Sequence, residues 1–136
     1  MNAPQQPTPT LAPPFLQETA PYFLAACKRL AQIWDRWDED DEDDWEDAIH
    51  DARNALVFAE GLLKPSRPPK EITLNKSKWS HLRSCIPEDF PSLEAAAPHL
   101  LAACRRLLRD WDDKKYVTSG VVEDAQIAIL IAEGWV

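Results

Sequence analysis

The chain contains two diverged copies of one segment, and this repeat constrains the fold more than any other feature of the sequence. Residues 14–35 align with residues 91–112 at an offset of 77, with 12 identities in 22 positions. The match resumes at an offset of 73, where residues 59–61 and 132–134 both read Ala-Glu-Gly. Two matching blocks in the same order indicate a duplication, and a loop between them would absorb the four-residue difference.

Each copy begins with the spacing of an amphipathic helix. Apolar side chains recur at steps of four and three residues, which places them on one face of a helix. In the first copy this stripe is Phe23, Cys27, Leu30, Trp34 and Trp37, and in the second it is Leu100, Cys104, Leu107 and Trp111.

A second helix is expected in each copy, over residues 45–60 and 121–133. Gly61 and Gly134 then follow the ends of these helices, where a C-cap residue in the left-handed conformation is expected. Pro21 and Pro98 suit the first turn of the preceding helices, where a missing N–H is no loss. Residues 127–132 are apolar without a break, so a buried strand is the alternative there; the alanine content and the repeat favour a helix.

One hairpin buries too little surface to be stable alone, and 136 residues leave room for one domain. The sequence therefore predicts an all-α fold in which two tandem helical hairpins form a four-helix bundle-like domain. The expected parts are a flexible, disordered Pro-rich tail (1–14), hairpin repeat 1 (15–63), a basic connector (64–86) and hairpin repeat 2 (87–136). Within the connector, Trp79, Leu82 and Ile86 could line a short helix that caps the bundle.

The second copy reads Pro-x-Leu-Leu-Ala-Ala-Cys-Arg-Arg-Leu-Leu over residues 98–108 and, after a polar loop, Asp-Ala-x-x-Ala-x-x-x-Ala-Glu-Gly over residues 124–134. This pattern resembles that of small helical hairpin proteins encoded by bacteriophages and prophages. The resemblance covers both copies, about two thirds of the chain. It implies an origin in bacteria or a mobile element. It supplies no activity and no binding residue that could be assigned to this chain. The chain departs from the pattern in its second copy, its basic connector and its six tryptophans.

Charge is spread unevenly along the chain, whose net charge is −8 and pI about 4.8. Residues 1–63 carry −9, residues 64–86 carry +5, and residues 87–136 carry −4. The total argues against general nucleic-acid binding and against an anionic membrane surface. The cations of the connector either form a short nucleic-acid strip with Trp79 and His81, or lie against the acidic lobes, which the flanking charge favours. They are Lys64, Arg67, Lys70, Lys76, Lys78 and Arg83.

The motifs of catalysis and cofactor binding are missing from the sequence. Three glycines leave no phosphate-cradling loop, and no serine stands at a nucleophile elbow. Cys27 and Cys104 are expected to be buried thiols rather than metal ligands, and His50 a surface histidine. We therefore expect no enzyme, no cofactor and no metal. The odd cysteine count and the absence of a signal or membrane-spanning segment indicate a soluble protein of a reducing compartment, the cytoplasm.

The most unusual local feature is the acidic run from residue 38 to residue 44. It does not fit a calcium loop, because an EF-hand starting at Asp38 would need glycine at Asp43 and a carboxylate at Ile49. It is either a solvated loop whose last acids favour the next helix, or a binding surface with aromatic anchors. The candidate partner-binding residues are Trp37, Asp38, Asp40, Asp41, Asp43, Asp44 and Trp45.

The expected function is that of a non-enzymatic, acidic module or accessory subunit that binds another protein with a basic surface. The alternative is an acidic inhibitor that mimics nucleic acid and blocks a host defence enzyme that binds nucleic acid.

Overall fold

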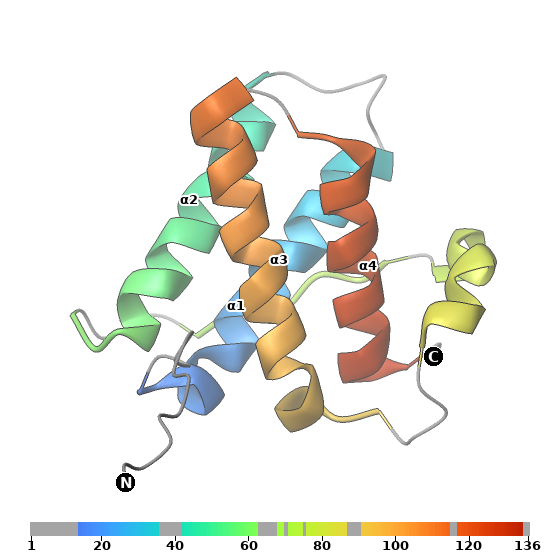
Figure 1. Ribbon diagram of the computed structural model, residues 1–136, viewed down its shortest axis with the longest axis horizontal. Helices are drawn as coiled ribbons and strands as arrows, with labels where there is room; N and C mark the ends of the chain where they lie inside the picture. Colours follow the sequence, from blue (N-terminus) through green and yellow to red (C-terminus); the bar gives the residue numbers. More distant parts are fainter. Residues whose placement is uncertain are drawn as a thin grey trace, which may run out of the picture.

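The computed structural model describes residues 14–35, 42–62, 68–69, 71–74, 76–86, 91–114 and 117–134. Four α-helices account for most of them: α1 (Leu16–Asp35), α2 (Glu42–Ala59), α3 (Leu93–Lys114) and α4 (Ser119–Glu133). One 3₁₀ helix, η2 (Lys76–Cys85), lies in the connector (Figure 1). No strand occurs in this part of the chain, and residues 127–132 lie inside α4. The all-α prediction is confirmed.

The helices form two hairpins that pack together as a bundle. α1 packs against α2 and α3 packs against α4, as the repeat predicts. α1 also packs against α3 and α4, and α2 against α3, so the first helices of the two hairpins form the centre of the bundle. In Figure 1, α1 (blue) and α3 (orange) both run upward, whereas α2 (green) and α4 (red) run downward.

A local two-fold relationship connects the two hairpins. The Cys27 Sγ lies 4.0 Å from the Cys104 Sγ, and these residues are 77 positions apart, the offset of the repeat. Gln17 and Glu94 are also 77 apart, and the Gln17 Nε2 donates to the Glu94 carbonyl at 3.5 Å. Equivalent residues therefore meet at two levels of α1 and α3, as they do in a parallel coiled coil. The axis runs between these two helices, roughly along them.

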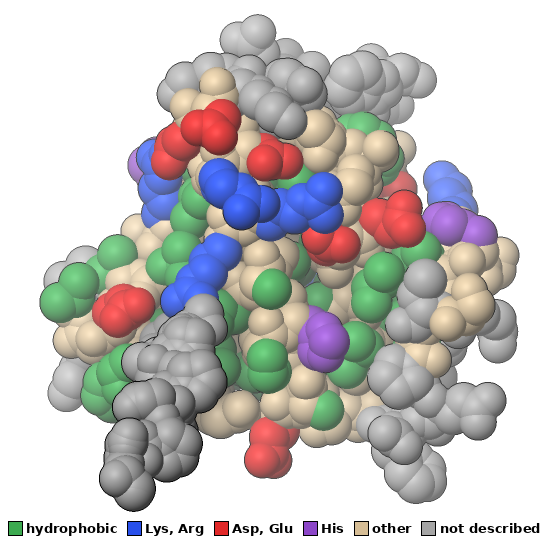
Figure 2. Space-filling model, viewed as in Figure 1, with side chains coloured by type: hydrophobic (Ala, Val, Ile, Leu, Met, Phe, Trp, Pro, Cys, Tyr) green, Lys and Arg blue, Asp and Glu red, His purple; other side chains and the backbone are tan. Residues whose placement is uncertain are grey.

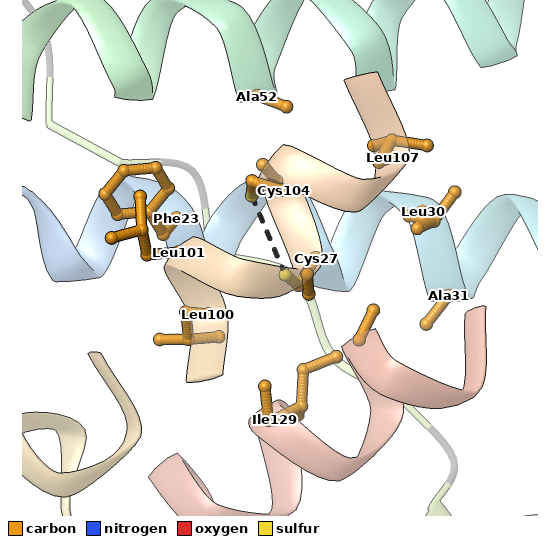
Figure 3. Close-up of a cluster of buried hydrophobic side chains, with 14 of the residues drawn as sticks. Phe23, Cys27, Leu30, Ala31, Ala52, Leu100, Leu101, Cys104, Leu107 and Ile129 are labelled. Atoms are coloured by element: carbon orange, nitrogen blue, oxygen red, sulfur yellow. Dashed lines mark hydrogen bonds between the residues drawn. The ribbon is translucent and has the colours of Figure 1, made fainter. Parts of the chain in front are cut away.

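The core fills the space around this axis (Figure 3). Phe23, Leu30, Leu100 and Leu107, all from the predicted stripes, are at most 2% exposed. Alanines at the facing positions let the helices approach closely, because a methyl group needs little room. The buried alanines of α2 are Ala48, Ala52, Ala55 and Ala59, and those of α4 are Ala125 and Ala128.

The prediction that Pro21 and Pro98 occupy the first helical turn is wrong. α1 begins at Leu16 and α3 at Leu93, so both prolines lie inside their helices. The extra turn of α1 is stabilised by packing, because Leu16 is buried in the core. A proline at this depth leaves the carbonyl four residues earlier without its N–H donor. For Pro98 that carbonyl belongs to Glu94, and it accepts the long hydrogen bond from Gln17.

A glycine with positive φ follows the second helix of each hairpin, as the sequence predicts, but the two helix ends differ. Gly134 is the C-cap of α4, with ψ at −165° and so outside the left-handed helical region, whereas α2 ends at Ala59, two residues before Gly61. Gly61 and Gly134 have φ values of 79° and 77°, a region that favours glycine. The segment before each first helix is also held in a similar way. The Phe15 N–H donates to the Ala59 carbonyl, and the Ser92 N–H to the Ile131 carbonyl, both at 2.9 Å.

The connector contributes to the core through η2. The sequence predicts a short helix that caps the bundle, but η2 lies beside α4 and is a 3₁₀ helix kinked at Trp79. Trp79 and Leu82 are each only 1% exposed, so η2 is part of the packed domain. Within the described residues, no helix combines the length and the apolar character needed to cross a membrane.

Candidate functional site

Most of the predicted partner-binding residues lie outside the described part of the chain. Trp37, Asp38, Asp40 and Asp41 fall between α1 and α2 and are not described. Asp43 and Asp44 belong to the first turn of α2, although their side chains are not described either. Trp45 is therefore the one candidate whose surroundings can be given in full.

Trp45 and Trp34 close the end of the first hairpin. Their rings meet edge to face, with centroids 6.3 Å apart and planes at 70°, a favourable geometry for two aromatic rings. Both side chains are half-buried and pack against the core. The segment that carries the acidic run thus starts and ends beside an ordered aromatic pair.

Carboxylates continue along α2 beyond the acidic run. Glu46 and Asp47 are exposed on the next turn, as is His50. The Arg29 Nε of α1 lies 3.1 Å from an Asp51 oxygen, and its Nη1 lies 3.9 Å from an Asp47 oxygen. Arg29 therefore neutralises the inner part of this acidic face and leaves Glu46 open to solvent.

Asp35, the last residue of α1, belongs to the same end of the molecule. Partial burial raises the pKa of its carboxyl above the ordinary value, and the positive charge of Lys78 opposes part of this effect. Lys78 belongs to η2, so the charge of one connector cation acts on an acid at the end of α1.

The corresponding end of the second hairpin is built differently. α4 begins with Ser119, Gly120 and Val121 and has no acid in its first turn. Its N-terminus is capped by Thr118, whose Oγ1 accepts the Val121 N–H at 3.4 Å. The ion pair behind it is conserved between copies, because Arg106 and Asp124, 2.5 Å apart, occupy the positions of Arg29 and Asp51.

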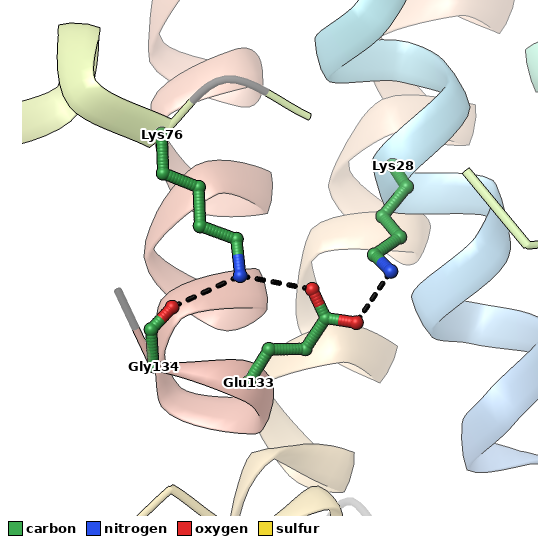
Figure 4. Close-up of polar contacts among 4 residues, drawn as sticks. All are labelled: Lys28, Lys76, Glu133 and Gly134. Carbon is green, nitrogen blue, oxygen red and sulfur yellow. Dashed lines mark hydrogen bonds and ion pairs between the residues drawn. The ribbon is translucent and has the colours of Figure 1, made fainter. Parts of the chain in front are cut away.

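A partly buried polar network fastens the connector to the bundle (Figure 4). Glu133 of α4 pairs with Lys28 of α1 and, at 3.0 Å, with Lys76 of η2, while the Lys76 Nζ also donates to the Gly134 carbonyl at 3.0 Å. Burial opposes ionisation of Glu133, but the two ammonium groups outweigh it and hold the pKa of Glu133 below its ordinary value. The network joins three elements that are distant in sequence.

Within its described residues, the connector does not expose the tryptophan that a nucleic-acid strip would need. Trp79 is buried, and its Nε1 has no hydrogen-bond partner among the described residues. Lys76 is 7% exposed and is committed to Glu133 and Gly134. Neither side chain is available for a base or a phosphate. The side chains of Lys64, Arg67, Lys70 and Arg83 are outside the described set.

The two core cysteines are buried thiols, as predicted. Cys27 is 2% and Cys104 is 1% exposed. The hydrogen bond with Cys27 and the burial both raise the pKa of the Cys104 thiol well above its ordinary value. A thiol of this kind stays protonated and is a poor nucleophile. In the described part of the chain, no group of three or more His, Cys, Asp or Glu side chains has the arrangement of a metal site.

One surface feature was not predicted from the sequence. A shallow groove of about 220 Å³ lies between α3 and α4, lined by His99, Ala102, Ala103, Asp124 and Ile127. Exposed arginines follow it along α3, and Figure 2 shows Lys and Arg side chains gathered over the upper part of this helix. Two signals in the sequence point to it: histidine replaces Tyr22 at position 99, and Arg105 and Arg109 are one turn apart.

No protein-family model, curated protein or solved structure matches this chain.

Proposed function

We propose that the chain is a non-enzymatic protein-binding module whose α1–α2 end binds a basic surface on another protein. The observation that carries this proposal is the contrast between the two hairpin ends. The helices and the Arg–Asp pairs repeat, whereas the α2 end is acidic and the α4 end has an uncharged first turn. Equivalent scaffolds need equivalent cores but not equivalent loops, so a loop that differs this much supports a specialised role.

The stability of α2 accounts for only part of the acidic run. Negative charge near a helix N-terminus contributes about 0.3–1 kcal/mol, and the effect is confined to the first turn. That accounts for acids at residues 42–44. The acids at residues 38–41 precede the helix and repel one another, so their presence favours an external cation as their partner.

The Trp34–Trp45 pair supports the same reading. A rigid aromatic base reduces the entropy that the flanking segment loses on binding, and aromatic residues beside charge are frequent binding hot spots. Because Trp45 is partly committed to Trp34, we expect Trp37 to be the anchor that reaches the partner.

The test is affinity capture from bacterial lysate with the immobilised full chain, at about 50 mM and about 500 mM salt. The variant replaces Asp40, Asp41, Asp43 and Asp44 by Asn. The matched control replaces four exposed carboxylates elsewhere, Glu18, Glu60, Glu94 and Glu123, by Gln. Proteins that bind the wild type and the control but not the Asn variant support the proposal. Equal capture by all three forms contradicts it.

The nature of the captured protein separates the two candidate functions. If it binds nucleic acid, and an oligonucleotide displaces it, the chain is an acidic mimic of nucleic acid. If an oligonucleotide has no effect and Trp37→Ala speeds dissociation, the chain is an adaptor or accessory subunit. The resemblance to phage-encoded hairpins makes a bacterial lysate the appropriate source.

A further inference from the structure

The two-fold relationship relates the outer faces of α1 and α3, but these faces are not equally covered. Tyr22, Ala25, Lys28 and Gln32 of α1 are all half-buried. Their counterparts on α3 are all exposed: His99, Ala102, Arg105 and Arg109. On the α1 side the connector takes part, since Lys76 joins Glu133, the partner of Lys28. On the α3 side nothing in the described chain does the same.

The groove between α3 and α4 lies beside a position that holds a larger, packed ring in the first hairpin. Tyr22 occupies the position of His99, and its ring reaches across to Phe58 of α2, with centroids 5.5 Å apart at 73°. In the second hairpin the smaller His99 ring is exposed and the groove beside it is open. Its floor is Ala102 and Ala103, which leave room for a side chain from outside.

The charge beside the groove is positive and partly unneutralised. Arg106 is paired with Asp124, and Arg53 of α2 is paired with Asp112 at 2.6 Å. Arg105 and Arg109 have no carboxylate partner within the described residues. Like charges one turn apart destabilise a helix by a few tenths of a kcal/mol. An anionic ligand would remove that repulsion.

We infer that this groove and the adjacent arginines bind an acidic segment of a partner protein. One aromatic side chain of that segment lies beside His99, and the carboxylates of the segment pair with Arg105 and Arg109. The aromatic residue follows from the first hairpin, where the larger Tyr22 ring stands at the position of His99 and packs on the Phe58 ring. The acidic character follows from the two unpaired guanidinium groups, which bind carboxylates in a bidentate manner. This surface is distinct from the acidic α1–α2 end.

A nucleic acid fits this surface less well than a peptide. Carboxylates surround the arginines, and those without a described cation partner include Asp113 and Glu123, both exposed (Figure 2). A continuous phosphate backbone would meet these charges, whereas a peptide can place its few carboxylates between them.

The test measures fluorescence anisotropy of the full chain with a short fluorescein-labelled peptide of glutamates around one phenylalanine. A second peptide has serine in place of phenylalanine, and a third probe is an oligonucleotide of equal charge. We expect the phenylalanine peptide to bind at least about ten-fold more tightly than either. No binding below about 1 mM, or equal affinity for all three probes, overturns the inference.

Three variants assign the binding to this face. Arg105→Gln with Arg109→Gln should lower the affinity about ten-fold or more. His99→Tyr introduces the residue of the first hairpin, so its ring should fill the groove. The affinity for the phenylalanine peptide should then fall to the affinity for the serine peptide. Lys78→Gln, an exposed cation on η2, should change affinity by less than about two-fold. If His99→Tyr, with an unchanged melting curve, binds like the wild type, the groove is not the site.

Discussion

The Cys27 Sγ lies 4.0 Å from the Cys104 Sγ, and the two cysteines occupy equivalent positions in the two repeats. The contact marks where the two hairpins meet through equivalent surfaces. Pairing of like surfaces is the geometry of a symmetric dimer. In this chain it occurs within one polypeptide, and the connector is the main element that breaks the symmetry.

The two halves of the core should contribute similarly to stability. Leu30 and Leu107 are 1% and 2% exposed at equivalent positions. Leu30→Ala and Leu107→Ala should each reduce the free energy of unfolding by about 2–5 kcal/mol, measured by urea denaturation. A cost below about 0.5 kcal/mol for either variant would place that leucine outside the core.

The paired thiols should be protected from chemical modification. In a Cys85→Ser background, a thiol reagent at mildly alkaline pH should label the folded protein far more slowly than the protein in urea, because both remaining thiols are buried and the pKa of Cys104 is raised. The unfolded protein gives the control rate. Labelling at that rate in the folded state would show that the α1–α3 contact opens freely.

Glu133 should make the domain sensitive to acid. Its pKa in the folded state is lower than the ordinary value of 4.5, so its ion pairs stabilise the fold above that pH, and the contribution is lost as the pH falls through the lowered pKa. Between about pH 6 and about pH 3, the wild type should therefore lose more stability than Glu133→Gln. Parallel losses for the two proteins would contradict a stabilising role for the Lys28–Glu133–Lys76 network.

The two glycines with positive φ should tolerate substitution unequally. Positive φ alone should cost Gly61→Ala and Gly134→Ala about 1 kcal/mol each. A Cβ on Gly61 would lie 2.6 Å from the Phe15 ring, which is 42% exposed and has room to move. A Cβ on Gly134 would lie 2.8 Å from the Pro91 ring, which is fixed to its backbone. Thermal melts should therefore show the larger loss for Gly134→Ala.

Replacing an internal proline should stabilise α3. Pro98 is exposed, so Pro98→Ala removes no core packing, and it supplies the N–H that the Glu94 carbonyl lacks. We expect a higher melting temperature and a gain of about 1 kcal/mol or more, since proline inside a helix costs about 3 kcal/mol. A lower melting temperature would mean that the hydrogen bond from Gln17 already compensates for the missing donor.

The candidate site was predicted from the sequence only in outline. A run of acids between two tryptophans can be identified without coordinates, but the contact between Trp34 and Trp45 depends on how two helices meet. The groove beside His99 was missed for the same reason. Whether a gap between helices is filled depends on side chains of both helices, and neither Ala102 nor Ile127 signals a surface feature on its own.

The helices, the repeat and the glycines that follow α2 and α4 can be read from the sequence alone. Apolar spacing near 3.6 residues and glycine at a left-handed position are local properties, and each is legible in a window of a few residues. The tertiary structure sets which elements lie next to one another. It extended α1 and α3 past Pro21 and Pro98, because packing of residues such as Leu16 outweighs the loss of one hydrogen bond per helix. It also placed η2 against α4, where the buried Lys76 ammonium is paired with Glu133 and the Gly134 carbonyl, and left the outer face of α3 exposed.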